Sequence, residues 1–172
     1  MATNRRDAIL KGAALLGVTV GAGALRSGVG AAEPARAGAT VLYGRHWHIQ
    51  SRAIRKGEQP PAGIRMLVRG ELVDQPQGGR KVGAFFATYY RLNTPGKVGG
   101  HEPGSLELHT FVFPDGTLVG SGVADAAHGS EAQFALLGGT GRFHGARGSY
   151  TARQNHLELG GDGTASFTLT LI

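Results

Sequence analysis

The chain contains no cysteine. A disulfide framework, a thiolate nucleophile and a zinc or iron–sulfur site with cysteine ligands are therefore excluded. Charge is also scarce: 17% of the residues are Asp, Glu, Lys or Arg, and the formal net charge is +6. The basic residues form no dense stripe with aromatic residues between them. The composition therefore argues against a nucleic-acid partner.

Long hydrophobic runs and helical periodicity are missing as well. Beyond residue 39 no stretch of 11 or more residues repeats its apolar positions with a helical period, which argues against a helical domain. The uncharged stretch over residues 12–25 is shorter than the ~20 residues that a resident membrane helix needs. The 172 residues have room for one domain.

The N-terminal residues have the pattern of an export signal. Arg5 and Arg6 precede the uncharged stretch, small residues follow it, and the paired arginines resemble the twin-arginine motif. We predict a twin-arginine-type signal peptide over residues 1–32, a flexible lead-in over 33–39 and a single β-barrel domain over 40–172. The mature protein is then expected in the periplasm or outside the cell, with no stable membrane insertion after cleavage. An N-terminal anchor helix is the alternative.

The rest of the chain alternates between short strands and turns. Ile64, Met66 and Val68 alternate with polar residues, as in a half-buried strand, and Pro114-Asp115-Gly116 is a strong turn signal. We predict strands over residues 40–49, 64–74, 81–92, 105–113, 117–123, 132–137, 148–154 and 164–172. Eight such strands predict an all-β fold, either a closed antiparallel barrel or a sandwich. A closed barrel of this size has no unpaired edge and can hold one small ligand.

Glycine is abundant: 30 of the 172 residues, about 17%, are glycine, against a usual frequency of about 7%. One dense run, Gly138-Gly139-Thr140-Gly141, follows an apolar stretch and superficially matches a dinucleotide-binding fingerprint. That fingerprint needs a helix after the glycines and an acidic residue about 20 residues later. The following residues, 142–149, contain too much glycine to open a helix. We therefore interpret the run as a sharp corner or bulge in a curved strand.

The segment over residues 134–148 resembles the glycine-rich strand-turn-strand of the allene oxide cyclase and dirigent families. Residues 111–122 are similar to the hairpin before it, and residues 164–172 to the closing strand. The similarity covers residues 100–172 well and residues 40–99 only by strand count. It implies an eight-stranded, calycin-like closed antiparallel barrel that binds a small hydrophobic molecule and forms a homo-oligomer, either a trimer or a dimer. It also implies that no metal or organic cofactor is needed. The plant cyclase has a Glu at the end of its first strand, and residues 43–50 here contain no carboxylate, so we do not transfer that role.

Glu107 and His109 share one face of a predicted strand with Phe111 and Phe113. A carboxylate and an imidazole on an aromatic face can move a proton if that face lines a pocket. The alternative is an outward face covered by a neighbouring subunit. On the preceding strand, Tyr90 lies on the more apolar face, so we expect it in the interior. There its hydroxyl could stabilise a developing oxyanion or simply be part of the core.

His46 and His48 lie two residues apart and are expected on one face of the first strand. They are either acid–base groups in a pocket or surface histidines on either side of Trp47. A cupin-like metal site would need further ligands that the sequence does not supply, so we assign no metal. Arg65 and Arg69 also share a face. If they point inward they favour an anionic or carbonyl ligand, and otherwise they are solvated.

These observations predict a cofactor-free cyclase or isomerase that acts on a small, largely apolar substrate inside the barrel. The catalytic candidates are Tyr90, Glu107, His109, His46 and His48, and the ligand-binding candidates are Phe86, Trp47, Arg65 and Arg69. One alternative is a non-catalytic dirigent-like or lipocalin-like protein that binds a hydrophobic molecule. Another is a structural barrel whose interior is filled by bulky side chains such as Phe86 and Phe134.

Overall fold

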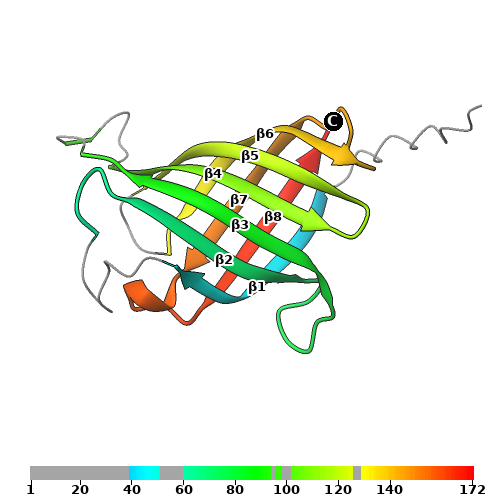
Figure 1. Ribbon diagram of the computed structural model, residues 1–172, viewed down its shortest axis with the longest axis horizontal. Coiled ribbons are helices and arrows are strands. Elements are labelled where there is room, and N and C mark those ends of the chain that lie inside the picture. Colours follow the sequence, from blue (N-terminus) through cyan, green and yellow to red (C-terminus); the bar gives the residue numbers. More distant parts are fainter. Residues whose placement is uncertain (1–38, 51–59, 94–95, 98–101, 126–128) are drawn as a thin grey trace, which may run out of the picture. The chain divides into compact units, whose positions relative to one another are not determined.

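The protein folds into a closed antiparallel barrel of eight strands (Figure 1). The structure, a computed structural model, describes residues 39–50, 60–93, 96–97, 102–125 and 129–172. The strands are β1 (Ala39–Ile49), β2 (Arg65–Val73), β3 (Lys81–Arg91), β4 (Pro103–Phe113), β5 (Gly116–Asp125), β6 (Glu131–Gly141), β7 (Gly148–Asn155) and β8 (Thr164–Leu171). A short 3-10 helix, η1 (Leu157–Leu159), lies between β7 and β8.

The strands pair in chain order, and β1 pairs with β8 to close the barrel. The predicted all-β barrel and its eight strands are therefore confirmed. The predicted signal peptide, and the lead-in up to residue 38, lie outside the described residues. Within the described part of the chain, no helix is long and apolar enough to cross a membrane.

The glycine run belongs to the end of β6. β6 pairs with β5, and the register shifts where Gly138 faces Val119 and Leu136 faces Gly120. Leu137 is the extra residue of this bulge, and Gly141 ends the strand with a φ of 60°. The interpretation of these glycines as a bulge and a corner is thereby confirmed, since only glycine adopts a positive φ without steric cost.

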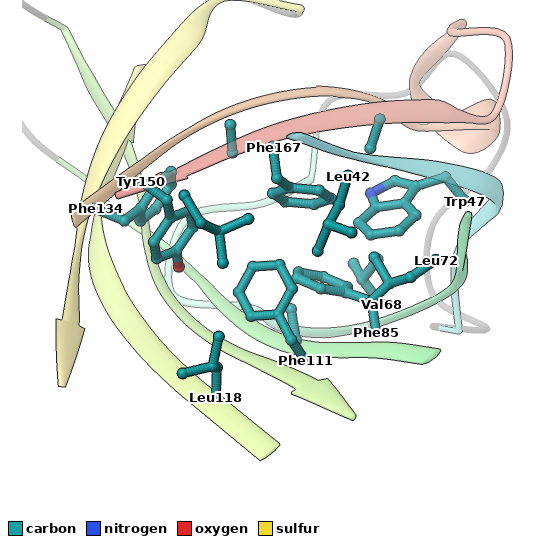
Figure 2. Close-up of a cluster of buried hydrophobic side chains, with 14 of the residues drawn as sticks. Leu42, Trp47, Val68, Leu72, Phe85, Phe111, Leu118, Phe134, Tyr150 and Phe167 are labelled. Atoms are coloured by element: carbon teal, nitrogen blue, oxygen red, sulfur yellow. The ribbon is translucent and has the colours of Figure 1, made fainter. Parts of the chain in front are cut away.

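The largest side chains that fill the barrel interior are aromatic (Figure 2). Phe85 from β3, Phe111 from β4 and Phe167 from β8 contact one another, with ring centroids 5.1–5.2 Å apart. These three fully buried residues are called the phenylalanine layer below. Phe134 is also buried, as a filled barrel would require, whereas Phe86 lies on the outer surface and is 44% exposed.

Trp47 packs on the interior side of a backbone irregularity in β1. The register with β2 shifts between Arg45 and His48, and His46 adopts a positive φ of 54°. The fully buried indole then lies over two glycines: a Cβ on Gly44 would lie 2.7 Å from the ring, and a Cβ on Gly70 would overlap it. The absence of side chains at these two positions therefore makes the space for Trp47.

We expect Gly70→Ala to destabilise the barrel, because the added methyl group overlaps the indole of Trp47. Overpacking of this kind in a closely packed core costs about 1–3 kcal/mol, which chemical denaturation monitored by circular dichroism measures. Gly138→Ala is the matched control, since the nearest atom to its added Cβ is the flexible end of Arg147 at 3.3 Å. Equal stability of the two variants would contradict this account of Gly70.

Candidate functional site

A cluster of polar side chains is buried at the end of the barrel where β4 begins and where β3 and β7 finish. Alternate residues of β4, namely Ser105, Glu107 and His109, point into the interior, and their exposed fractions are 9%, 3% and 0%. Polar groups in such surroundings are costly unless they are hydrogen-bonded. In the part of the chain that the structure describes, every buried side-chain nitrogen and oxygen has a partner.

Glu107 is at the centre of this cluster. The Ser105 hydroxyl donates to Glu107 Oε1 at 2.7 Å, and Gln154 Nε2 donates to Oε2 at 3.0 Å. His109 Nε2 lies 2.7 Å from the same Oε2. Hydrogen bonds to a carboxylate are stronger than those between neutral groups, and they offset part of the cost of burying its charge.

His109 connects Glu107 to Tyr150 on β7. The Tyr150 hydroxyl lies 2.8 Å from His109 Nδ1, and burial, together with the charge of Glu107, raises the pKa of Tyr150 well above its ordinary value. The tyrosine therefore keeps its proton at neutral pH and can donate it to Nδ1. We assign the remaining imidazole proton to Nε2, from which it is donated to Glu107, since this arrangement gives every donor an acceptor.

A second arm of the cluster runs through Gln154. Because Gln154 Nε2 donates to Glu107, its Oε1 faces two donors, the Tyr89 hydroxyl and the Trp47 indole nitrogen at 3.2 Å. Burial, followed by the charge of Glu107, raises the pKa of Tyr89 well above its ordinary value, so this hydroxyl also stays protonated. His156 Nε2 lies 3.3 Å from the Tyr89 oxygen. Side chains from β1, β3, β4 and β7 are thus joined in one network.

The network has the groups needed for proton transfer in an apolar site. Glu107 can accept a proton, and His109 is hydrogen-bonded to both the carboxylate and the Tyr150 hydroxyl, so it connects these two groups. Aromatic rings surround the imidazole, with Phe134 at 4.6 Å and Phe85 at 5.0 Å between ring centroids. Such surroundings exclude water and strengthen the electrostatic interactions within the site.

Among the predicted site residues, Glu107, His109 and Trp47 lie in the interior. The interior position predicted for Tyr90 is wrong: Tyr90 is 45% exposed on the outer surface, and Tyr89 is the inward tyrosine of β3. The reason is that both faces of β3 carry aromatic residues, so its sequence does not indicate which face is inside. The inward face carries Phe85, Ala87 and Tyr89.

The other predicted residues lie outside the barrel. Arg65 and Arg69 alternate outward on β2, and Phe86 alternates outward on β3, so none of these three lines the interior. His46 and His48 are exposed on either side of Trp47, and His48 Nδ1 lies 3.3 Å from Glu158 Oε1. This position corresponds to the alternative in which the two histidines are surface residues.

Sequence reasoning missed Ser105, Tyr89, Tyr150, Gln154 and His156. Ser105 could have been found, because it lies two residues before Glu107 and so shares its face. The same alternation places Tyr150 and Gln154 on one face of β7. The contacts of these two side chains with β4 depend on the closure of the barrel. Tyr150 is 41 positions from His109 in the sequence, and Gln154 is 47 positions from Glu107.

The arrangement of the strands is shared with several solved structures. The pterocarpan synthase dirigent protein PsPTS1 is 19% identical with a TM-score of 0.62, and the match covers 81% of this chain and 97% of that one. The barrel is of the dirigent type. A heme-binding cyclase of neoabyssomicin biosynthesis is 16% identical with a TM-score of 0.54, over 81% of this chain and 66% of that one. Pyocyanin demethylase is 13% identical with a TM-score of 0.52, over 78% of this chain and 100% of that one.

These likenesses concern the fold. No protein-family model matches the sequence, and no curated protein matches it. The shared barrel confirms, at the level of the architecture, the sequence resemblance to the allene oxide cyclase and dirigent families. The chemistry of this barrel has to be argued from its own side chains.

We expect Tyr89 and Tyr150 to remain protonated in the folded protein at pH 10–11, because both pKa values are raised. Tyr150 should then not contribute to the rise in tyrosinate absorbance that the folded protein shows up to pH 11. We expect Tyr150→Phe to leave the size of that rise unchanged. Unfolded tyrosine ionises near pH 10, so the folded state holds more protons above that pH and stability falls as pH rises. Tyr150→Phe should make this fall shallower, as measured by denaturation between pH 9 and 11. A smaller absorbance rise in the folded variant would contradict the assignment.

Proposed function

We propose that the protein is an isomerase or cyclase that acts on a small, largely apolar substrate bound at the Glu107 end of the barrel, using proton-transfer groups of its own chain. The observation that carries the proposal is a buried carboxylate linked to an imidazole and a protonated tyrosine inside an aromatic barrel. A purely structural barrel would gain stability from apolar side chains at these positions, because a buried charge is costly even when it is paired. The dirigent-type fold, which cyclases also adopt, supports the same class of function.

In this proposal Glu107 is the general base. Its Oε2 is held by His109 and Gln154, whereas Oε1 accepts from the Ser105 hydroxyl, which can turn about a single bond. A substrate C–H or O–H directed at Oε1 would replace the Ser105 hydroxyl as its partner. The proton returns to another atom of the substrate, so the product is an isomer. While the charge on Glu107 changes, His109 keeps its hydrogen bond to the carboxyl group and Tyr150 keeps its hydrogen bond to His109.

We expect the wild-type protein to accelerate the ring opening of 5-nitrobenzisoxazole, a small apolar probe of base catalysis. A carboxylate removes the ring C–H proton and the N–O bond breaks, which gives a coloured nitrile phenolate and the protonated carboxyl group, and the carboxyl group then returns its proton to water. Glu107→Gln removes the base and keeps the shape of the side chain, and we expect it to lower kcat/KM at least 100-fold, within the range of general-base contributions. Tyr90→Phe is the matched control, because Tyr90 lies outside the barrel. Equal rates for wild type and Glu107→Gln would contradict the role of Glu107.

A non-catalytic binding protein is the second candidate. The observation that favours it is the complete pairing of the buried polar groups among the described residues, which suits a preorganised site for one polar group of a ligand. Native mass spectrometry of the protein purified from its own cells detects a bound compound, and chromatography of the released compound, which separates isomers of equal mass, distinguishes the two. A binding protein would release an unchanged compound, and Glu107→Gln would retain that compound. An isomerase would convert the compound, and only Glu107→Gln would hold it unconverted.

We further propose that the protein is a homo-oligomer. Large apolar side chains lie side by side on the outer face of β2–β5, where the register places Tyr90 next to Leu106 and Leu106 next to Val123. The exposed members of this face are Leu67, Phe86, Tyr90, Leu106, Leu108 and Val123, each 43–46% exposed. Contiguous apolar surface of this kind is typical of an interface.

We expect Leu108→Glu to dissociate the oligomer, because it places a charge in the middle of this face. Light scattering coupled to size-exclusion chromatography measures the mass. Val41→Glu on β1 is the control, with a similar exposure of 44% but a position on a different strand. A wild-type protein that elutes as a monomer of 17.8 kDa or less would overturn the proposal.

A further inference from the structure

A cavity lies at the opposite end of the barrel from Glu107. Its volume is about 410 Å³, within the ~300–1,000 Å³ that small-molecule sites occupy. Aliphatic side chains form its walls, among them Leu42 from β1, Val82 from β3, Leu118 from β5 and Leu169 from β8. Phe113, Phe143, Arg142 and Asp115 also line it. The side chains of Arg142 and Asp115 are 56% and 49% exposed, so the cavity reaches the surface there.

The phenylalanine layer separates this cavity from the Glu107 cluster. Along β4 the inward side chains follow in the order Glu107, His109, Phe111 and Phe113. Six residues of an antiparallel strand span about 20 Å, and Phe111 lies between the two ends. The cavity shares no lining residue with the polar network around Glu107. It is therefore a site in its own right and does not depend on the function proposed for Glu107.

The glycine run at the end of β6 builds the mouth of this cavity. Gly141 has a φ of 60°, and a Cβ there would collide with the Asp115 carbonyl group. Because glycine has no Cβ, the Arg142 amide can donate to the Asp115 carbonyl oxygen at 3.0 Å. A Cβ on Gly139 would lie 2.7 Å from the Cβ of Phe143. The glycines thus allow the turn after β6 to approach the β4–β5 hairpin and place Arg142 and Phe143 over the opening.

Arg142 is held in one place by three contacts. Its Nη1 lies 3.0 Å from Asp115 Oδ2, and its guanidinium carbon lies 4.5 Å from the centre of the Phe143 ring and 5.8 Å from that of Phe113. A guanidinium has five N–H donors, of which the Asp115 contact uses one or two. Because the Asp115 carboxylate already balances the positive charge, the mouth favours a neutral acceptor over an anion.

We propose that this cavity binds a neutral, mainly apolar small molecule that carries a hydrogen-bond acceptor such as a carbonyl oxygen, with the apolar part against the aliphatic walls and the acceptor at Arg142. The walls supply affinity by removing apolar surface from water. The fixed guanidinium supplies orientation, because its donors are already in place before the ligand arrives.

The first test uses N-phenyl-1-naphthylamine, a neutral fluorescent probe. We expect saturable binding to the wild-type protein and at least a tenfold loss of affinity in Val82→Trp and in Leu171→Trp, each of which fills the cavity from a different strand. Leu137→Trp, on the outer surface and outside the cavity, is the control and should bind as the wild type does. Thermal denaturation identifies any variant that fails to fold.

Chemical-shift mapping of backbone amides by nuclear magnetic resonance tests the same site without any substitution. Binding should move the signals of Gly116, Gly141 and Phe143 and leave those of Glu107, His109 and Gln154 in place. The absence of saturable probe binding, equal affinity in the filled variants, or shifts centred on Glu107 would each overturn the proposal.

A matched pair of competitors tests the part played by Arg142. 2-Acetylnaphthalene and 2-ethylnaphthalene have similar shapes, but only the first carries a carbonyl oxygen. We expect the acetyl compound to displace the probe at a severalfold lower concentration in the wild type, and Arg142→Met to abolish this difference. The anion 2-naphthoate should compete less well than 2-acetylnaphthalene. A preference for the anion, or an acetyl preference that survives Arg142→Met, would overturn the acceptor assignment.

Discussion

The arrangement of the barrel interior depends on the burial of one carboxylate. Glu107 lies among aromatic rings and accepts hydrogen bonds from β4 and β7, and Gln154 extends the network to β1 and β3. Removing one partner of a buried charge costs far more than the same contact contributes at a surface. The registers of four strands are therefore coupled, because a slip in any of them would leave a charge or a donor without its partner.

The two ends of the barrel differ in chemistry because the phenylalanine layer separates them. One end holds a polar network suited to proton transfer, and the other holds an aliphatic cavity with a neutralised cation at its mouth. The glycine-rich segment, the strongest sequence resemblance to the dirigent and allene oxide cyclase families, belongs to the second end. It therefore indicates how the barrel is built and gives no information on what happens around Glu107.

Much of the fold could be predicted from the sequence. Turn residues separate eight short segments, and alternation within Ser105–Phe113 placed Glu107 and His109 together on one face, which is the inner face in the structure. The facing of β3 could not be predicted, since aromatic residues occupy both of its sides and its outer side belongs to an apolar surface. The irregularity at His46 also breaks the alternation on which any prediction for β1 depends.

The partners of Glu107 on β7 were beyond such reasoning for a different reason. Local pattern shows that Tyr150 and Gln154 share a face, but the distance to Glu107 is set by the registers of β5, β6 and β7 and by closure of the barrel. Two of these pairings also include register shifts, between Pro103 and Ser105 and between Val119 and Gly120. Contacts of this kind follow from the sum of several pairings and not from any one segment.

The pairing of β1 with β8 has a consequence for biosynthesis. β1 finds its second partner only in β8, the last strand of the barrel, so a nascent chain can form at most an open sheet with two bare edges until β8 has been synthesised. The Glu107 network needs β7, and the β1 edge is covered only once β8 has emerged. Closure therefore waits until β8 has been synthesised, and it links segments about 120 to 130 residues apart, a topology typical of slow-folding proteins. During that interval the open edges of β1 and β7 are exposed to strands of other nascent chains.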